Sequence, residues 1–196
     1  MPWPEPVTLS GTHARLEPLA PRHEAGLIDA ARDGELWKLW YTAVPSPDGM
    51  AAEITRRLGL QARGSMLPFT VFDVHGRIAG MTTYMNIDAT HKRVEIGSTW
   101  YAASAQRTPL NTECKLMLLQ HAFERLDCIA VEFRTHRLNT QSRRAIERLG
   151  AQLDGMLRAH QRTADGNLRD TAVYSITAAE WPTVKAHLRW QLERPR

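Results

Sequence analysis

The residues between Ser104 and Lys115, SAQRTPLNTECK, form a loop whose position suits the binding of an anion. They follow a strand-like run that ends at Trp100 and Tyr101, and they open an apolar-periodic helix that runs to about Leu126. A strand-to-helix corner of this kind gathers unpaired backbone N–H groups at the positive end of a helix dipole. We therefore expect the corner to bind a phosphate-bearing ligand.

Length and composition describe an ordinary globular domain. The chain has 196 residues, of which 43% are hydrophobic and 23% are charged, and these values argue against a coiled coil, a collagen-like chain or a disordered chain. The net charge is +4, but the 25 basic residues are interleaved with 21 acidic ones. Nucleic-acid binding is therefore a weak alternative, and we expect no nucleic-acid partner.

The sequence has no recognisable targeting signal and no membrane-spanning run. The first residues, MPWPEP, have neither the basic nor the apolar region of a signal peptide, and no run of about 18 apolar residues occurs. Cys114 and Cys128 are too few for a disulfide scaffold and lack metal-ligand spacing. We expect a cytoplasmic protein with no metal and no membrane partner, and a homodimer remains open.

Periodicity divides the chain into an extended leader (1–6), a single domain (7–176) and a C-terminal helical extension of that domain (177–196). Alternation and helical spacing predict the elements of the domain in chain order. They are a short strand or hairpin at 7–19, helices at 21–31 and 50–62, strands at 69–74, 77–87 and 92–101, a helix at 112–126, a strand at 129–136, a helix at 139–149, and a hairpin of 151–162 with 168–176.

Three short phrases in the sequence resemble those of a known family. They are RLEPL (residues 15–19), VEIG (94–97), and NTQS (139–142) followed by RLG (148–150). In this order they resemble the GNAT superfamily of acyl-CoA-dependent N-acyltransferases, in its ribosomal-protein N-acetyltransferase (RimJ/RimL-like) branch. The resemblance implies an α/β (α+β) fold with a mixed, mostly antiparallel central sheet of about seven strands, flanked by about four helices, plus a C-terminal helix.

The resemblance also implies a ligand and the residues that bind it. The ligand is acetyl-CoA or another short-chain acyl-CoA, and the corner is its pyrophosphate loop. Asn139 would meet the pantetheine or acyl amide, and Ser142 would lie near the CoA sulfur. The implied cofactor-binding residues are Gln106, Arg107, Thr108, Leu110, Asn111, Thr112, Lys115, Asn139 and Ser142.

The loop departs from the family pattern at two positions. Pro109 and Asn111 stand where the family usually has glycines, and proline has no N–H for a phosphate oxygen, although it suits the first turn of a helix. We expect Asn111 to cap a helix that begins at Thr112. Arg107 and Lys115 would supply charge in place of the lost donor, the alternative being that both are solvated surface residues.

Few residues could act as acid or base. Glu95 lies on the strand before the corner and could take a proton from an amine directly or through water, the alternative being a salt-bridged strand residue. Ile146 stands where many members of the superfamily have a tyrosine that protonates the leaving thiolate, so Ser142 is the remaining proton donor. Weaker candidates for the base are His136, His160 and Asp170.

We expect transfer of an acetyl or other short acyl group to a primary amine, by direct attack in a ternary complex. The acceptor would be a protein N-terminus or a small amine, with Trp37, Trp40 and Trp100 as candidate substrate-binding residues, although tryptophans are more often packing anchors. The resemblance implies that a β-bulge near Thr99–Tyr101 frees backbone donors for the acyl oxygen. The alternative is a non-catalytic acyl-CoA-binding or regulatory module, which would account for the altered loop.

Overall fold

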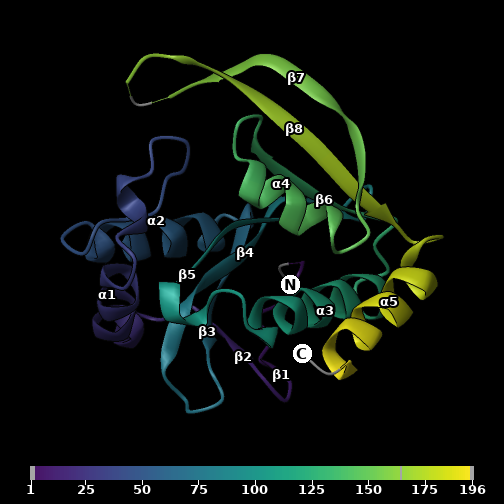
Figure 1. The fold of residues 1–196 in the computed structure, drawn as a ribbon, viewed down its shortest axis with the longest axis horizontal. Coiled ribbons are helices and arrows are strands. Elements are labelled where there is room, and N and C mark those ends of the chain that lie inside the picture. Colours follow the sequence, from purple (N-terminus) through teal and green to yellow (C-terminus); the bar gives the residue numbers. More distant parts are fainter. Residues whose placement is uncertain (1–2, 164, 195–196) are drawn as a thin grey trace.

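The computed structural model describes residues 3–163 and 165–194, which form one sheet with helices on both faces (Figure 1). The sheet has eight strands in the order β1-β2-β3-β4-β5-β6-β8-β7, and every neighbouring pair is antiparallel except β5 and β6. The strands are β1 (Leu9–Ser10), β2 (Arg15–Pro18), β3 (Met66–Phe72), β4 (Ile78–Asp88), β5 (Arg93–Tyr101), β6 (Ala130–His136), β7 (Gln152–Arg162) and β8 (Leu168–Thr177).

Five α-helices pack against this sheet in the described part of the chain. They are α1 (Glu24–Arg32), α2 (Met50–Ala62), α3 (Pro109–Glu124), α4 (Thr140–Glu147) and α5 (Trp181–Glu193). The predicted mixed, mostly antiparallel sheet is therefore confirmed, with eight strands rather than about seven. The helix predicted at 50–62 has the predicted bounds, and the one predicted at 21–31 begins with a 3₁₀ turn (Pro21–His23), which is common at helix N-termini.

Alternation along the strands sends apolar side chains to two cores, one on each face of the sheet. One core lies beneath α3, α4 and α5, and includes Phe69, Tyr84, Val94, Ile96 and Leu118. The other lies beneath α1 and α2, and includes Leu27, Met50, Met81 and Trp100. Because β4 and β5 contribute to both cores, they are fixed from both sides.

Glu113 ties the start of α3 to the first hairpin of the chain. Its carboxylate accepts hydrogen bonds from three consecutive N–H groups in the β1–β2 turn, those of Thr12 (2.9 Å), His13 (2.5 Å) and Ala14 (2.7 Å). The turn can approach this closely because Gly11 has no side chain, and a Cβ there would lie 2.4 Å from the Glu113 carboxyl carbon. Hydrogen bonds to a charged acceptor are stronger than neutral ones, so this contact holds the helix N-terminus in place.

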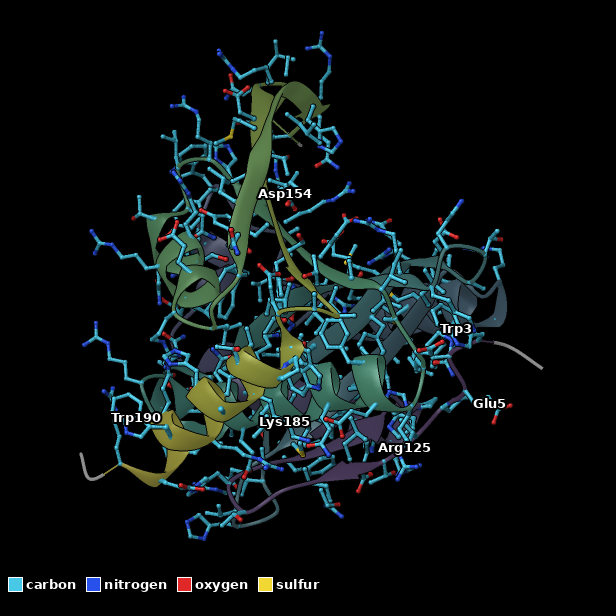
Figure 2. The ribbon with its side chains drawn as sticks, turned by 90° about the vertical axis from the view of Figure 1, so that its right-hand side faces the viewer. Trp3, Glu5, Arg125, Asp154, Lys185 and Trp190 are labelled. Carbon is cyan, nitrogen blue, oxygen red and sulfur yellow. The ribbon has the colours of Figure 1, made fainter. Side chains whose placement is uncertain are left out.

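The hairpin of β7 and β8 extends beyond the rest of the sheet. It arches over α4 in Figure 1, and in Figure 2 it rises away from the layer of α3 and α5, with Asp154 on β7. Most of β7 is exposed, because it is the edge strand. On the other side of the molecule, Lys185 of α5 pairs with Glu124 of α3 at 2.6 Å and joins these two helices.

Gly80 on β4 is essential to the close approach of β4 and β5. Its φ is 150°, and a Cβ at this position would lie 2.1 Å from the carbonyl oxygen of Trp100. We expect Gly80→Ala to lower the free energy of unfolding by about 2–4 kcal/mol, because the two backbones must separate. Urea denaturation measures this loss. Gly155→Ala is the matched control, since a Cβ at Gly155 meets nothing within 4 Å, and equal losses in the two variants would refute the explanation.

Candidate active site

A β-bulge interrupts the pairing of β5 with β4. Thr83 pairs with Gly97 and Met81 pairs with Trp100, so two residues of β5 oppose a single residue of β4 between these pairs. Ser98, in the bulge, has a left-handed φ of 47°. Such a bulge disrupts the ladder locally and leaves backbone groups unpaired. The bulge implied by the family resemblance is therefore present, slightly earlier in the strand than expected.

On its other side, β5 separates from β6 soon after the two strands meet. Parallel pairing joins Arg93–Glu95 to Ala130–Glu132 and goes no further, whereas β6 continues to pair with β8 as far as His136. The backbone groups on this edge of β5, from Ile96 onward, therefore have no strand partner in β6. Backbone N–H and C=O groups in the middle of a sheet require a partner, so the opening is suited to a ligand with amide groups.

Helix α3 starts beside this opening, and it starts earlier than predicted. Its first residue is Pro109 and its N-cap is Thr108, whose hydroxyl accepts from the Leu110 N–H (3.3 Å) and donates to the Ala105 carbonyl (2.7 Å). The prediction that Asn111 caps a helix beginning at Thr112 is therefore wrong. Pro109 is tolerated because the N–H at the first helical position has no partner within the helix.

The other residues of the predicted phosphate loop have different roles. Gln106 donates from Nε2 to the Tyr101 carbonyl at 3.0 Å and closes the loop. Arg107 is exposed and holds a left-handed φ of 59°. Leu110 and Thr112 are buried, and the Thr112 hydroxyl accepts from Arg148 at 3.1 Å.

The Asn111 side chain is the unsatisfied polar group at this helix start. Its Oδ1 is buried and has no hydrogen-bond partner among the described residues. A carboxamide turned by 180° presents its NH₂ donors at the same place. The position therefore suits a ligand that only accepts hydrogen bonds, such as a phosphate, next to the unpaired N–H groups of the helix start.

Lys115 contacts the bulge rather than the loop. Its side chain is buried, and its ammonium donates to the hydroxyls of Thr99 (2.8 Å) and Thr82 (3.2 Å), which also bond to each other (2.8 Å). Burial lowers the pKa of this lysine to about 8. We therefore assign Lys115 to the support of the bulge, in place of the expected contact with phosphate.

The start of α4 lies on the same face of the sheet as α3. Asn139 is the N-cap of α4, and its Oδ1 accepts from the backbone N–H of Ser142 at 3.0 Å. Asn139 thus caps α4 with its Oδ1, and its Nδ2 remains available as a donor. Ser142 is half-buried in the first turn, and Ile146 packs into the core below it.

Glu95 lies on the opposite face of β5, next to the bulge. It is only 4% exposed, it accepts from Asn86 Nδ2 at 2.6 Å, and its carboxylate lies 3.5 Å from Arg134 Nε. Burial raises the pKa of Glu95, although the Asn86 hydrogen bond and the Arg134 charge oppose this. A raised pKa makes a carboxylate a better proton acceptor near neutral pH. Glu95 and Met85 pack closely against Gly97, where a Cβ would lie 2.8 Å from Glu95 Oε1 and 2.7 Å from Met85 Sδ.

The side chains around Glu95 were not all foreseen. The sequence analysis did not identify Asn86, whose backbone is left-handed with a φ of 46°. An asparagine within a strand pattern can indicate such an irregularity, because asparagine tolerates left-handed backbone. Among the other base candidates, burial lowers the pKa of His136, and the Ala159 N–H with nearby arginines lowers the pKa of Asp170. His160 bonds to the Thr171 hydroxyl at 3.1 Å. Glu95 is therefore the best placed of these groups.

A small pocket of about 300 Å³ lies at the end of β6, between the α1–α2 connection and the β7–β8 hairpin. Trp40, which is 60% exposed, forms its wall and meets the His136 ring edge-on at 5.2 Å. Trp37 is half-buried against the core beneath α1 and α2, and Trp100 lies within that core. We therefore assign Trp100 to packing, and of the three tryptophans only Trp40 lines this pocket.

A larger cavity of about 650 Å³ lies between α1, the β3–β4 turn and the start of α3. It is lined by Thr108, Pro109 and Leu110 of the loop, but neither Glu95 nor Asn139 lines it, so it does not include the part of the candidate site around β5 and α4. Within residues 3–163 and 165–194, no three His, Cys, Asp or Glu side chains are grouped as metal ligands would be. No helix in that part of the chain combines the length and apolar character needed to cross a membrane.

Comparison with known proteins identifies the family. The family model for the acetyltransferase (GNAT) domain matches residues 13–152, which is more than half of the chain. The chain belongs to the GNAT acetyltransferase family. The resemblance inferred from its sequence is thereby confirmed. No curated protein matches it significantly.

Solved structures show the same GNAT fold. A putative acetyltransferase from T. thermophilus is 33% identical, with a TM-score of 0.85, and the match covers 97% of this chain and 99% of that one. A GCN5-related N-acetyltransferase from Brucella melitensis is 32% identical, with a TM-score of 0.83 and coverage of 96% and 87%. RimJ from Mycobacterium smegmatis, solved with CoA-disulfide, is 23% identical with a TM-score of 0.78 and coverage of 96% and 95%, which shows a shared fold.

The residues of this GNAT domain fit the acyl-CoA that the family uses. The β5 edge beyond Glu95 offers unpaired backbone groups, and the carboxamide of Asn111 has an unsatisfied buried atom at the α3 start. Asn139 offers a free amide donor at the start of α4. These groups lie along one opening in the sheet.

The hydrogen bond from Asn86 stabilises the ionised form of Glu95. We expect Asn86→Ala to raise the pKa of Glu95 further, because removal of a donor to the carboxylate favours the protonated form. Carboxyl-detected NMR titration measures the midpoint. Asn167→Ala, on the exposed β7–β8 turn, is the control and should leave the midpoint unchanged. A lower midpoint in Asn86→Ala would contradict the assignment.

The buried ammonium of Lys115 makes stability depend on pH. Its pKa is about 8 in the folded state and near 10.5 in the unfolded state, so the unfolded state binds more protons between these values and stability should rise with pH there. Over this whole range the rise should amount to at most about 3.4 kcal/mol. We expect Lys115→Met to abolish it, while Thr82 and Thr99 stay bonded to each other.

Urea denaturation at several pH values between 7 and about 11 measures this slope. Lys38→Met is the control, because Lys38 is exposed and pairs with Glu35 on the surface. An unchanged slope in Lys115→Met would show that the ammonium is not the source.

Proposed function

We propose that this GNAT domain transfers an acetyl or other short acyl group from acyl-CoA to a primary amine, by direct attack in a ternary complex. One observation carries the proposal. The broken edge of β5 has the starts of α3 and α4 on one face and the carboxylate of Glu95 on the other. The edge of β5, the α3 N-terminus and Asn139 would hold the acyl-CoA, which supplies an activated thioester.

The acceptor amine must lose a proton to react. At neutral pH, roughly a tenth of an α-amino group with a pKa near 8 is in the neutral form. For a lysine with a pKa near 10.4, the free energy of the neutral form is about 4 to 5 kcal/mol above that of the protonated form. The nitrogen forms a bond to the acyl carbon as the carbon–sulfur bond breaks, and its proton passes to Glu95, directly or through water. The raised pKa of Glu95 supports this role.

Two further groups assist the reaction in this proposal. Backbone N–H groups at the bulge polarise the acyl oxygen, and the Ser142 hydroxyl gives a proton to the departing thiolate. Ile146 is buried and has no proton to give. Because CoA thiolate is a good leaving group, we assign Ser142 a smaller contribution than Glu95.

Acetyl is the donor group favoured by the relatives, since those that are 32–33% identical are described as acetyltransferases. For the acceptor we propose a protein N-terminus or a small amine, because an α-amino group has a lower pKa than a lysine and is deprotonated more easily by the base.

The alternative is a domain that binds acyl-CoA without catalysis. It is favoured by Pro109, which removes one donor from the loop, and by Ile146 in place of an acid.

Release of free thiol from acetyl-CoA over a panel of amines tests the proposed function. We expect Glu95→Gln to lower kcat by about 10²–10⁴, mainly below the pKa of the amine. Asn139→Ala should raise the KM for acetyl-CoA and lower kcat/KM about tenfold. Glu35→Gln, an exposed change outside the site, is the control.

Rates equal to wild type in both variants would overturn the site assignment. Calorimetry with acetyl-CoA separates the two functions. Binding without thiol release on any amine would favour the non-catalytic domain.

A further inference from the structure

Glu95 and the two nearby carboxylates, those of Glu132 and Asp170, form ion pairs with four arginines. Glu132 pairs with Arg93 and, at 2.8 Å, with Arg134, which also lies 3.5 Å from Glu95. Asp170 pairs with Arg137 at 3.2 Å and with Arg158 at 2.9 Å. Each of these negative charges therefore has at least one positive partner already.

Arg169 is the fifth arginine of this group, and among the described residues it lacks an ion-pair partner. Its Nε is buried without a hydrogen-bond acceptor, and it forms no ion pair with any residue in 3–163 or 165–194. The side chain is half-buried, and burial lowers its pKa in spite of the nearby charge of Glu95. A half-buried guanidinium whose Nε has no acceptor is costly even with the charge of Glu95 nearby, so an absent anionic partner in direct contact would account for this arrangement.

The strand register places Arg169 on the same face of the sheet as Glu95 and close to the small pocket. On β8, Thr171 pairs with His136 of β6, and Arg169 lies two residues before Thr171, so the three side chains share one face of the sheet. Glu95 lies on this face as well, because it pairs with Glu132 of β6. The charge of Arg169 acts on both Glu95 and His136. His136, on the same face as Arg169, lines the pocket that has Trp40 as its wall, and so do Leu168 and Asp170, the sequence neighbours of Arg169 on the opposite face of β8.

We propose that Arg169 binds a carboxylate of the amine acceptor, so that the enzyme selects acceptors with a carboxylate near the primary amine. This specificity rests on the proposed acyl transfer. A guanidinium matches the geometry of a carboxylate with two parallel hydrogen bonds. Because only one of the five arginines described above is unpaired, a monoanionic carboxylate suits the site better than a phosphate dianion. The carboxylate belongs either to a free amino acid or to an acidic residue at a peptide N-terminus.

Matched acceptors test this specificity and separate the two sources. With acetyl-CoA, we would compare an α-amino acid with its amide, and a peptide amide that begins with Asp with one that begins with Asn. In at least one pair, we expect kcat/KM to be about tenfold to a hundredfold higher for the member with the carboxylate. Arg169→Gln should abolish this preference through a higher KM for the member with the carboxylate, so that the two members of the pair react with equal kcat/KM.

Arg158→Gln is the matched control, because Arg158 is an exposed arginine of the same hairpin that is paired with Asp170. It should retain the preference, and Arg169→Lys should retain part of it. Equal kcat/KM within both pairs, or an equal loss for both members in Arg169→Gln, would overturn the proposal.

Absence of turnover with every amine would remove the proposed function but would leave the carboxylate site testable. Calorimetry of the same four acceptors, on protein saturated with CoA, then measures binding alone. Tighter binding of a carboxylate member to wild type than to Arg169→Gln would support the site. Equal binding, or no binding, would overturn it.

Discussion

The candidate site depends on a break in the hydrogen bonding of one central strand. A sheet of eight strands gains stability from continuous pairing, yet β5 gives up pairing with β4 at the bulge and with β6 after Glu95. The break persists because its surroundings hold it from both faces. Lys115 and two threonines support the bulge from the α3 side, and on the other side Met85 and Glu95 pack closely against Gly97. The unpaired edge is therefore a built feature, available to a ligand.

Two buried ionisable groups lie on opposite faces of this strand, and burial acts on them in opposite senses. It raises the pKa of Glu95 and lowers the pKa of Lys115. Both shifts favour the neutral form, because a charge is poorly solvated inside the protein. The arginine that lacks an ion-pair partner among the described residues, Arg169, lies on β8 of the hairpin. The electrostatic character of the acceptor side is thus set by β6 and β8, while the donor side depends on helix starts and backbone groups.

The order of elements could be predicted from the sequence because each one has a strong local signal. The helix at 50–62 and the hairpin at 151–176 have clear periodicity and clear turns. The start of α3 was misjudged, because Thr108 and Pro109 form a capping signal that competes with Asn111. The partners of Lys115 and the surroundings of Arg169 could not be predicted, since they depend on strand register and on contacts between distant segments. Asn86 illustrates the same limit, because its role arises only where two strands meet.

The contact of Glu113 with the first hairpin has a consequence for the order of folding. The N–H groups of residues 12–14 donate to the carboxylate of Glu113, which lies 99 to 101 residues later in the chain. On a ribosome, the N-terminal turn is therefore synthesised long before its partner appears, and its three N–H groups lack this acceptor until then. Long-range contacts of this kind slow folding, because the chain entropy is lost before the contact forms. The turn at residues 12–14 thus gains its carboxylate partner only after the start of α3 has emerged, although β2 can pair with β3 earlier.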